Sequence, residues 1–365
     1  MAKYIYQEEN WTDFKWDEKK INVLFGEVRN LQGKISGQMN SLGFSSKKEA
    51  TLKTLTLDVV KSSEIEGEQL NYQQVRSSIA RRLGMDISGL VSSDRNVEGV
   101  VEMMLDATRN YEKPLTNERL FGWHSALFPT GYSGLYKIEV ARYRSGEMQV
   151  VSGAMGKEKI HYEAVSPKNL EREMQNFIDW LNNEKRLDPV LKAAIAHFWF
   201  IIIHPFDDGN GRIARAITDM LLTRAENSSD RFYSMSSQIL LDKKHYYAIL
   251  QKVQHSSGDI TKWIVWFLAC LKNALLETEN SMKKVLEKAK FWTIHEFTSL
   301  NERQRLMLNK VLDGFVGKLK SSKWAKITKC SRDTALRDMK DLIEKGILQQ
   351  DESGGRSTNY ELKRF

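Results

Sequence analysis

A stretch of twelve residues between two helical segments constrains the fold more than any other part of this chain. Residues 204–215 read His-Pro-Phe-Asp-Asp-Gly-Asn-Gly-Arg-Ile-Ala-Arg. The preceding residues 193–203 are apolar except for His197 and predict a buried helix. After the stretch, apolar residues recur every three to four positions, which predicts an amphipathic helix. The sequence therefore predicts a tight turn opening a helix, where free backbone N–H groups and the positive end of the helix dipole bind anions.

The side chains of this turn suit chemistry on a polyphosphate. His204 can accept a proton near neutral pH and is the candidate general base. Asp208 offers a hard oxygen ligand for a magnesium ion whose other ligands are water and phosphate oxygens. Arg212 and Arg215 are three positions apart on the new helix, so they face the same side and can hold successive phosphates.

The middle of the turn allows a close approach of the backbone to phosphate. Gly209, Asn210 and Gly211 have the small or flexible character that an anion-binding loop needs. Phe206 is expected to point inward as an apolar anchor. The alternative is a simple helix–loop–helix turn with a capping His204 and solvated arginines. Seven functional residue types in the right order favour the site.

In this order the residues resemble the signature of the Fic family, His-x-Phe-x-(Asp/Glu)-Gly-Asn-Gly-Arg-x-x-Arg, at every fixed position. The resemblance implies a mainly α fold and transfer of a nucleoside monophosphate, usually AMP from ATP, to a protein hydroxyl. It implies that His204 deprotonates the hydroxyl and that Asp208 binds Mg²⁺. The implied nucleotide-binding residues are Gly209, Asn210 (on the α-phosphate), Gly211, Arg212 (β-phosphate), Ile213, Ala214 and Arg215 (γ-phosphate).

A second motif suggests that such an activity is restrained. Residues 62–67 read Ser-Ser-Glu-Ile-Glu-Gly near the end of a helix predicted from about Lys48. They resemble the inhibitory motif of the same family, (Ser/Thr)-x-x-x-Glu-(Gly/Asn), with Ser62, Glu66 and Gly67 at the fixed positions. The resemblance implies that Glu66 pairs with Arg215, which then cannot bind the γ-phosphate. The alternative is a plain helix C-terminus, with Gly67 as a left-handed cap and Glu66 in solvent.

Residues 146–162 predict a β-hairpin, because two short β-like runs flank a Gly-rich turn. The family resemblance makes this hairpin a flap that docks the target backbone by strand addition. The alternative is a surface hairpin without such a role. Arg142, Tyr143 and Arg144 lead into it and are either structural or part of the cleft.

The adenosine is expected beyond the phosphates, near a helix that starts after a capping Asp242. The family resemblance places an aromatic residue there, and Tyr247 is the candidate for contact with the base or ribose. The alternative is that Tyr247 and its neighbours are ordinary core aromatics.

The whole chain is long enough for two or three domains with cores of their own: 365 residues, 41% of them hydrophobic. We predict a helical lead-in over 1–45, a Fic-type core with the inhibitory helix over 46–290, and a small domain over 301–365. The two cysteines, Cys270 and Cys330, make neither a disulfide framework nor a metal site. With no signal-peptide layout and no apolar run of membrane-spanning length, a cytoplasmic location without membrane partners is expected.

The last 65 residues carry 15 Lys and Arg against 9 Asp and Glu, which is most of the chain's net charge of +8. Helices are predicted over 302–312, around 322–328 and from a capping Ser331 to Gly346, followed by a hairpin with a turn at 353–356. This order resembles a winged helix-turn-helix domain. The residues expected to face DNA are Arg332, Thr334, Arg337, Lys340 and Arg356. The alternative is a module for protein contacts, because Asp333, Asp338 and Asp341 dilute the positive face.

These features together predict an autoinhibited protein adenylyltransferase that uses ATP and Mg²⁺ to modify a Ser, Thr or Tyr hydroxyl of a target protein, including itself. Three alternatives stay open: a DNA-binding regulator with a nucleotide-sensing core, transfer of another nucleotide, and removal of AMP with Glu66 positioning a water. A homodimer is expected from the architecture, although no residue specifies one.

Overall fold

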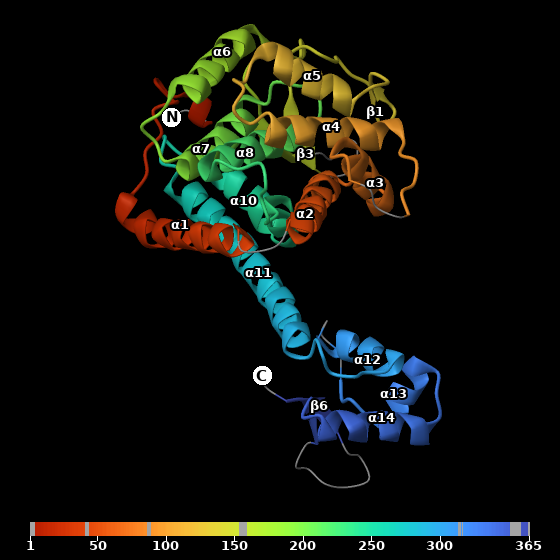
Figure 1. The fold of residues 1–365 in the computed structure, drawn as a ribbon. Coiled ribbons are helices and arrows are strands. Elements are labelled where there is room, and N and C mark those ends of the chain that lie inside the picture. Colours follow the sequence, from red (N-terminus) through yellow and green to blue (C-terminus); the bar gives the residue numbers. More distant parts are fainter. Residues whose placement is uncertain are drawn as a thin grey trace. The chain divides into compact units, whose positions relative to one another are not determined.

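The structure, a computed structural model of the chain, describes residues 4–40, 44–85, 89–152, 159–312, 315, 317–350 and 359–363. The chain forms two compact units, Met1–Thr278 and Glu279–Phe365. The division falls inside one long helix, α11 (Thr261–Ile294) (Figure 1). The first unit therefore includes both the expected lead-in and most of the expected core, and the second begins earlier than residue 301.

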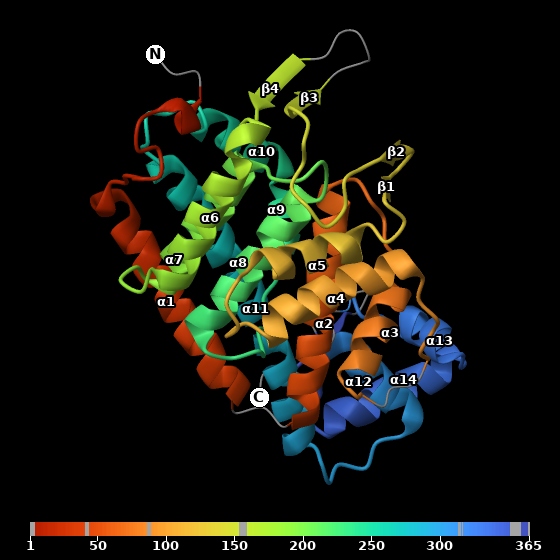
Figure 2. The ribbon, with the colours of Figure 1, turned by 90° about the horizontal axis from the view of Figure 1, so that it is seen from above.

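The first unit is mainly α-helical. Besides α11 it contains a short 3-10 helix, η1 (Ile5–Gln7), and ten α-helices: α1 (Glu18–Asn40), α2 (Phe44–Ile65), α3 (Tyr72–Arg82), α4 (Arg95–Arg109), α5 (Asn117–Leu127), α6 (Pro167–Asn183), α7 (Pro189–Ile203), α8 (Asn210–Glu226), α9 (Met235–Leu241) and α10 (Lys243–Val253). Its strands form two antiparallel hairpins, β1 (Tyr132–Ser133) with β2 (Tyr136–Lys137), and β3 (Gln149–Ser152) with β4 (Lys159–Glu163). Both hairpins project beyond the helices (Figure 2). The predicted mainly α fold is confirmed.

Helices α7 and α8 form the centre of this unit, joined by the motif turn predicted from the sequence. Pro189 and the Asp188 side chain, which accepts from the Val190 N–H at 2.7 Å, start α7. Nearly all of α7 is buried, including His197. Helix α8 packs against α7, α4, α2 and α5. The turn between α7 and α8 is thus held on a rigid, buried scaffold.

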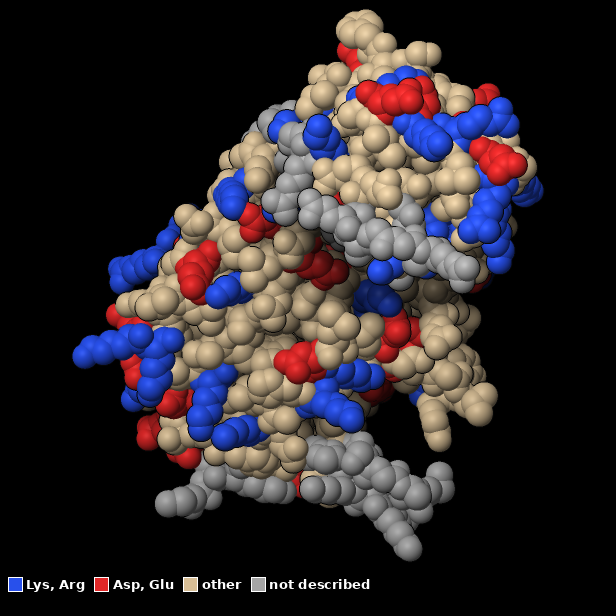
Figure 3. Space-filling model, turned by 90° about the horizontal axis from the view of Figure 1, so that it is seen from below, with Lys and Arg blue, Asp and Glu red and all other residues tan. Residues whose placement is uncertain are grey.

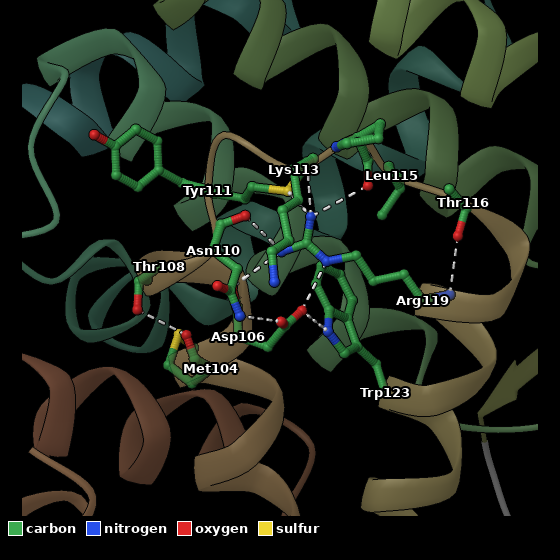
Figure 4. A network of polar contacts seen from close by, with 12 residues as sticks. Met104, Asp106, Thr108, Asn110, Tyr111, Lys113, Leu115, Thr116, Arg119 and Trp123 are labelled. Atoms are coloured by element: carbon green, nitrogen blue, oxygen red, sulfur yellow. Dashed lines mark hydrogen bonds and ion pairs between the residues drawn. The ribbon is translucent and has the colours of Figure 1, made fainter.

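A polar network fixes the corner between α4 and α5 (Figure 4). The Asp106 carboxylate accepts from Arg119 Nε and from Trp123 Nε1, both at 2.7 Å, and from Asn110 Nδ2 at 2.7 Å. Arg119 also donates to the carbonyl oxygens of Asn110 at 3.1 Å and Lys113 at 2.9 Å. These bonds satisfy free carbonyl oxygens at the end of α4 and in the connecting loop, and they fix the position of α5 relative to α4.

The predicted flap is present as β3 and β4, although its turn at 153–158 lies outside the described residues. The register pairs Val150 with Tyr162 and shifts before Val151. Tyr162 is buried, and its hydroxyl donates to the Ile202 carbonyl at 2.6 Å, which attaches the flap to the end of α7. Val150 and Ile160 keep 38% and 44% of their surface exposed.

Asp242 precedes α10 as predicted, but its side chain does not cap the helix. Helix α10 does begin at Lys243, but the Asp242 side chain makes no capping bond. Its Oδ2 instead accepts from Trp266 Nε1 at 2.9 Å and contacts His245 Nδ1 at 3.1 Å. A partner on α11, invisible in the local sequence, takes the carboxylate away from the helix N-terminus.

The second unit has the predicted order of elements: α12 (Glu302–Leu312), α13 (Ser321–Thr328), α14 (Arg332–Glu344) and the hairpin of β5 (Leu348–Gln350) with β6 (Tyr360–Leu362). Ser331 caps α14 by accepting from the Thr334 N–H at 3.1 Å, as predicted. Its small core is built around Trp324, Met339 and Leu342. The residues of the predicted hairpin turn lie outside the described part of the chain.

A buried ionic cluster attaches α2 to α8. Arg231 donates to Asp58 Oδ2 at 2.8 Å and pairs with Asp219 Oδ1 at 2.5 Å. All three side chains are at most 3% exposed. Burial raises the pKa of both Asp58 and Asp219, because the interior disfavours the charged carboxylate, and the negative charge of Asp219 raises the pKa of Asp58 further.

Substitution of Arg231 tests whether the ionic cluster stabilises the packing of α2 on α8. Arg231→Leu leaves two buried carboxylates without a partner and should lower the free energy of unfolding by about 3–5 kcal/mol. Urea denaturation followed by tryptophan fluorescence measures the loss. The control Arg142→Leu removes a guanidinium that is 68% exposed and should change little. Equal effects of the two substitutions would contradict the role of the cluster.

Candidate functional site

The turn between α7 and α8 has an unusual but well-supported backbone. His204 ends α7 in the left-handed region with φ of 52°, and Gly209 precedes α8 with φ of 82°. Phe206 is fully buried, as predicted, and stacks on His124 with ring centroids 4.2 Å apart. A non-glycine residue with positive φ costs free energy, so the surroundings must hold His204 in place.

Residues far away in the sequence provide this support, and the sequence did not reveal them. Arg144 Nε donates to the His204 carbonyl at 2.9 Å, and the Arg144 N–H donates to the Pro205 carbonyl at 3.0 Å. His124 Nε2 contacts the Asp208 carbonyl at 3.1 Å. Of the three residues before the flap, Arg144 is therefore structural. One feature of the sequence indicated this role, namely the position of Arg144 in a polar segment just before a predicted hairpin.

The Asn210 side chain has a structural role that the sequence did not predict. Its side chain is buried, accepts from the Phe206 N–H at 3.0 Å and donates to the Phe206 carbonyl at 2.7 Å. Both ends of the amide are thus used within the loop. Asn210 fixes the loop by its side chain, which leaves its backbone N–H at the start of α8 for an anion.

His204 is oriented to act as a base. Its Nδ1 lies 3.2 Å from the Ile201 carbonyl. Because a carbonyl oxygen can only accept, Nδ1 carries the proton and Nε2 keeps its lone pair. Nε2 has no hydrogen-bond partner among the described residues. Burial lowers the pKa of His204 to about 4, so the imidazole is neutral at physiological pH.

Arg215 is held by both ends of the predicted inhibitory motif. Its Nε donates to Ser62 Oγ at 2.8 Å, and its Nη2 donates to the Ser62 carbonyl at 2.9 Å and to Glu66 Oε1 at 2.7 Å. Arg215 is 2% exposed and the Glu66 side chain 28%. The Ser62 carbonyl is one of the free acceptors at the end of α2, which Arg215 satisfies.

Gly67 ends α2 as a left-handed cap, with φ of 89°. The Glu68 N–H donates to the Ser63 carbonyl at 3.0 Å and the Gly67 N–H to the Glu64 carbonyl at 3.1 Å, which is the pattern of a Schellman motif. The plain capping interpretation is therefore correct for Gly67. It is wrong for Glu66, whose carboxylate is paired rather than free in solvent.

Glu66 lies directly over the start of α8. A Cβ atom placed on Gly211 would be 2.1 Å from Glu66 Oε1, so no larger residue fits there without moving the carboxylate. The carboxylate thus occupies space beside the N–H groups that the turn offers to an anion. The Tyr247 hydroxyl also hydrogen bonds to Glu66, and burial raises the pKa of Tyr247 to about 12. Tyr247, 42% exposed, therefore faces the site.

The other residues expected to bind nucleotide differ in their placement. The Arg212 side chain is buried, and its Nη1 donates to Glu68 Oε2 at 2.6 Å. The Ile213 and Ala214 side chains are fully buried in the core. The Ile213 N–H already donates to the Gly209 carbonyl at 3.0 Å. We therefore find no group of Ile213 directed at a phosphate.

Asp208 fits a metal ion that arrives with a nucleotide. Its side chain is 42% exposed, Oδ1 accepts from the Gly209 N–H at 2.6 Å, and Oδ2 is bonded by the Ser133 hydroxyl. Among the described residues, no group of three or more His, Cys, Asp and Glu side chains could hold a metal. One carboxylate suits Mg²⁺, which keeps water and phosphate oxygens as its other ligands.

The residues expected to contact DNA lie on α14. Arg332 and Arg337 are exposed, and so is Lys340. The Thr334 hydroxyl is 2.9 Å from Ser331 Oγ in the cap. Arg356 lies outside the described residues. Of the three acidic residues expected to dilute the positive face, Asp338 is buried and accepts from Arg303 at 2.8 and 3.0 Å, whereas Asp333 is exposed and Asp341 half-buried.

Comparison with known proteins identifies the helical fold and its motif turn. A sequence model of the Fic/DOC family matches residues 114–222, and one of a domain of unknown function (DUF4172) matches residues 4–85. The chain therefore contains a Fic domain. The match over 4–85 includes the segment with Ser62, Glu66 and Gly67, and it crosses the boundary expected at residue 45.

Two named proteins are similar to part of this chain. Protein adenylyltransferase fic-1 of Caenorhabditis elegans is 32% identical over 114 residues, which are 28% of this chain and 22% of that protein. Protein adenylyltransferase Fic of Nematostella vectensis is 30% identical over 142 residues, 38% of this chain and 29% of that protein. The aligned part thus spans between a fifth and a third of these two relatives.

Solved structures show the same fold. A Fic family protein from Desulfovibrio desulfuricans G20 superposes with a TM-score of 0.52 and 21% identity over 94% of this chain and 96% of that one. Fic-1 of C. elegans gives a TM-score of 0.51 and 22% identity over 72% of this chain and 74% of that one. Among the described residues, no helix combines the length and apolarity needed to cross a membrane.

The pKa of His204 can be tested without any knowledge of the reaction. Because burial disfavours the imidazolium, we expect a ¹H–¹³C NMR titration to show His204 neutral above about pH 5, with a midpoint near 4. The spectrum of His204→Asn identifies the signal. A midpoint near the ordinary value of 6.5 would show that the imidazole is exposed to water and would contradict its placement.

Proposed function

We propose that this protein transfers AMP from ATP to the hydroxyl of a protein side chain and that Glu66 restrains the transfer at rest. The observation that carries the proposal is the neutral His204, with a free Nε2, next to the N-terminus of α8 and its two arginines. The named relatives support the same activity, since two that match part of this chain are called protein adenylyltransferases.

The geometry supports an in-line displacement. His204 Nε2 takes the proton of the attacking hydroxyl as its oxygen bonds to the α-phosphorus, and the bond from that phosphorus to the bridging oxygen breaks to release pyrophosphate. The N–H groups at the start of α8 face the α-phosphate, while Arg212 and Arg215 hold the β- and γ-phosphates. Asp208 would hold Mg²⁺, which neutralises phosphate charge when bound. The protein therefore contributes positioning, charge and one proton acceptor.

The target would reach this site along the flap. Among the described strands β3 pairs with β4 alone, so it offers a free edge, and Val150 and Ile160 are exposed on the hairpin. Tyr162 of β4 attaches the hairpin to the end of α7 through the Ile202 carbonyl. A target strand can pair with such an edge through its backbone, which places a Ser, Thr or Tyr hydroxyl without reading much sequence. Tyr247 would contact the adenosine once Glu66 has moved.

The site leaves some choices open. The loop contacts phosphates and does not read the base, so another nucleotide could replace ATP. Removal of AMP, with Glu66 positioning a water, uses the same residues. A homodimer and a cytoplasmic location remain predictions from the sequence.

Removing the Glu66 carboxylate should activate the protein. Glu66→Gly frees Arg215 for the γ-phosphate, and we expect transfer to rise by about a hundredfold, because a misplaced phosphate costs about that factor. Incorporation of label from α-³²P-ATP into the protein and into an added cell extract measures transfer. The double variant Glu66→Gly, His204→Ala should bind ATP but transfer nothing. An unchanged rate in Glu66→Gly would refute autoinhibition.

A second function, DNA binding by the C-terminal unit, is favoured by the arrangement of α14. Its inward face holds Asp338 in a fork with Arg303, while Arg332, Arg337 and Lys340 remain exposed on the helix. The Tyr360 N–H of β6 donates to the Leu319 carbonyl, which adds a bridge to the hairpin in the way that a winged helix requires. On the face shown in Figure 3, basic and acidic side chains are intermixed.

Salt dependence tests this second function. Arg332→Ala, Arg337→Ala should weaken binding to a mixed-sequence duplex and reduce the slope of log Kd against log salt by about two. Fluorescence anisotropy with the full chain measures both. Lys283→Ala removes a cation that is 75% exposed on α11 and serves as the control. A slope unchanged by the double substitution would exclude α14 as the DNA-binding element.

A further inference from the structure

The turn that follows α2 carries a second glutamate for which the sequence suggested no role. Glu68 lies two residues after Glu66, on the far side of Gly67. Its Oε2 accepts from Arg212 Nη1 at 2.6 Å, whereas Glu66 Oε1 accepts from Arg215 Nη2 at 2.7 Å. Both arginines of the motif therefore hold a carboxylate from the same short turn.

The backbone of this turn explains why both carboxylates reach α8. The Schellman hydrogen bonds from Gly67 and Glu68 to the last turn of α2 fix the path of the chain. The positive φ of Gly67, 89°, reverses the chain between the two glutamates. The single cap at Gly67 therefore places both Glu66 and Glu68 beside α8.

The two guanidiniums still have unused donors. Arg212 Nε and Arg215 Nη1 are buried and have no hydrogen-bond partner among the described residues. Both side chains are 2% exposed, so water does not replace the missing acceptors freely. Unpartnered buried donors indicate that each guanidinium is built to take more oxygen atoms than its glutamate supplies, as a phosphate group would provide.

From these contacts we propose that Glu68 determines nucleotide specificity by competing with the β-phosphate for Arg212. The proposal rests on the proposed function, in which Arg212 and Arg215 take the β- and γ-phosphates. In the resting protein a nucleoside monophosphate needs neither guanidinium. A diphosphate must displace Glu68, and a triphosphate must displace Glu68 and Glu66. The resting site therefore favours a nucleoside monophosphate, free or esterified to a protein, over ADP and ATP.

The two glutamates should have separable effects on binding. Removing the charge of Glu68 releases Arg212 and benefits every nucleotide with a β-phosphate. Removing the charge of Glu66 releases Arg215 and benefits ATP most, because ATP alone has a γ-phosphate. Because the Glu68 side chain is 46% exposed, the effect of Glu68 on ADP is modest, about three- to tenfold in Kd. AMP should be unaffected by the change at Glu68, since it has no β-phosphate.

Isothermal titration calorimetry on the full chain, with AMP, ADP and ATP each in the presence of Mg²⁺, tests the proposal. We expect Glu68→Gln to tighten ADP and ATP by about three- to tenfold without changing the affinity for AMP, and Glu66→Gln to tighten ATP more than ADP. The matched control is Glu64→Gln, since Glu64 lies on the same helix end and pairs with Lys61 rather than with a motif arginine. It should leave all three affinities within about twofold.

Glu68→Ala complements the glutamine variant, because the glutamine amide can still accept a hydrogen bond from Arg212. An ADP affinity unchanged in both Glu68 variants, or an equal gain for AMP, would overturn the role of Glu68. Failure of all the proteins to bind any of the three nucleotides would instead refute the proposed function. Binding of nucleotides with the expected pattern but without any transfer would leave Glu68 established and the transfer reaction refuted.

Discussion

The buried charge of Arg215 is the constraint on which the rest of the site depends. A guanidinium that is 2% exposed must find acceptors within the protein, and without them its burial would be strongly unfavourable. In the resting state those acceptors are the Ser62 hydroxyl, the Ser62 carbonyl and the Glu66 carboxylate. The residue placed to hold a phosphate thus also docks the end of α2. The stability of the resting state and the proposed inhibition therefore depend on the same contacts.

The attachment of α2 at two levels determines how that inhibition can be released. Asp58 lies eight residues before Glu66, about 12 Å along the helix, and is fixed by Arg231, which also pairs with Asp219, away from the phosphate loop. A ligand that supplies negative charge to Arg215 can therefore release the final turn of α2 while the rest of the helix stays in place. The polyphosphate itself is such a ligand, which makes nucleotide and Glu66 direct competitors.

Local sequence patterns predicted much of the fold and the positions of the motif residues. The bounds of α12, the Ser331 cap and the left-handed Gly67 follow from caps and periodicity, which act between neighbours in the chain. The pairing of Glu66 with Arg215 came from a family resemblance. The partnership of Glu68 with Arg212 spans 144 residues and that of Ser133 with Asp208 spans 75, so no local pattern could reveal them. The side-chain bonds of Asn210 to Phe206 were not predicted either, because they depend on the folded shape of the loop, while its contact with the α-phosphate stays a prediction.

The loop that carries the candidate base is complete before any nucleotide arrives. Arg144 supports the strained His204, and Asn210 closes the turn around Phe206. The His204 Nε2 has its lone pair available, because Nδ1 is committed to a carbonyl. The proposed inhibition therefore does not distort the base. Under that proposal it acts on the two arginines, so activation requires only that Glu66 and Glu68 release them. Because the base is already in place, release of the two arginines is the one change that the proposed activation needs, and no further part of the site has to be assembled.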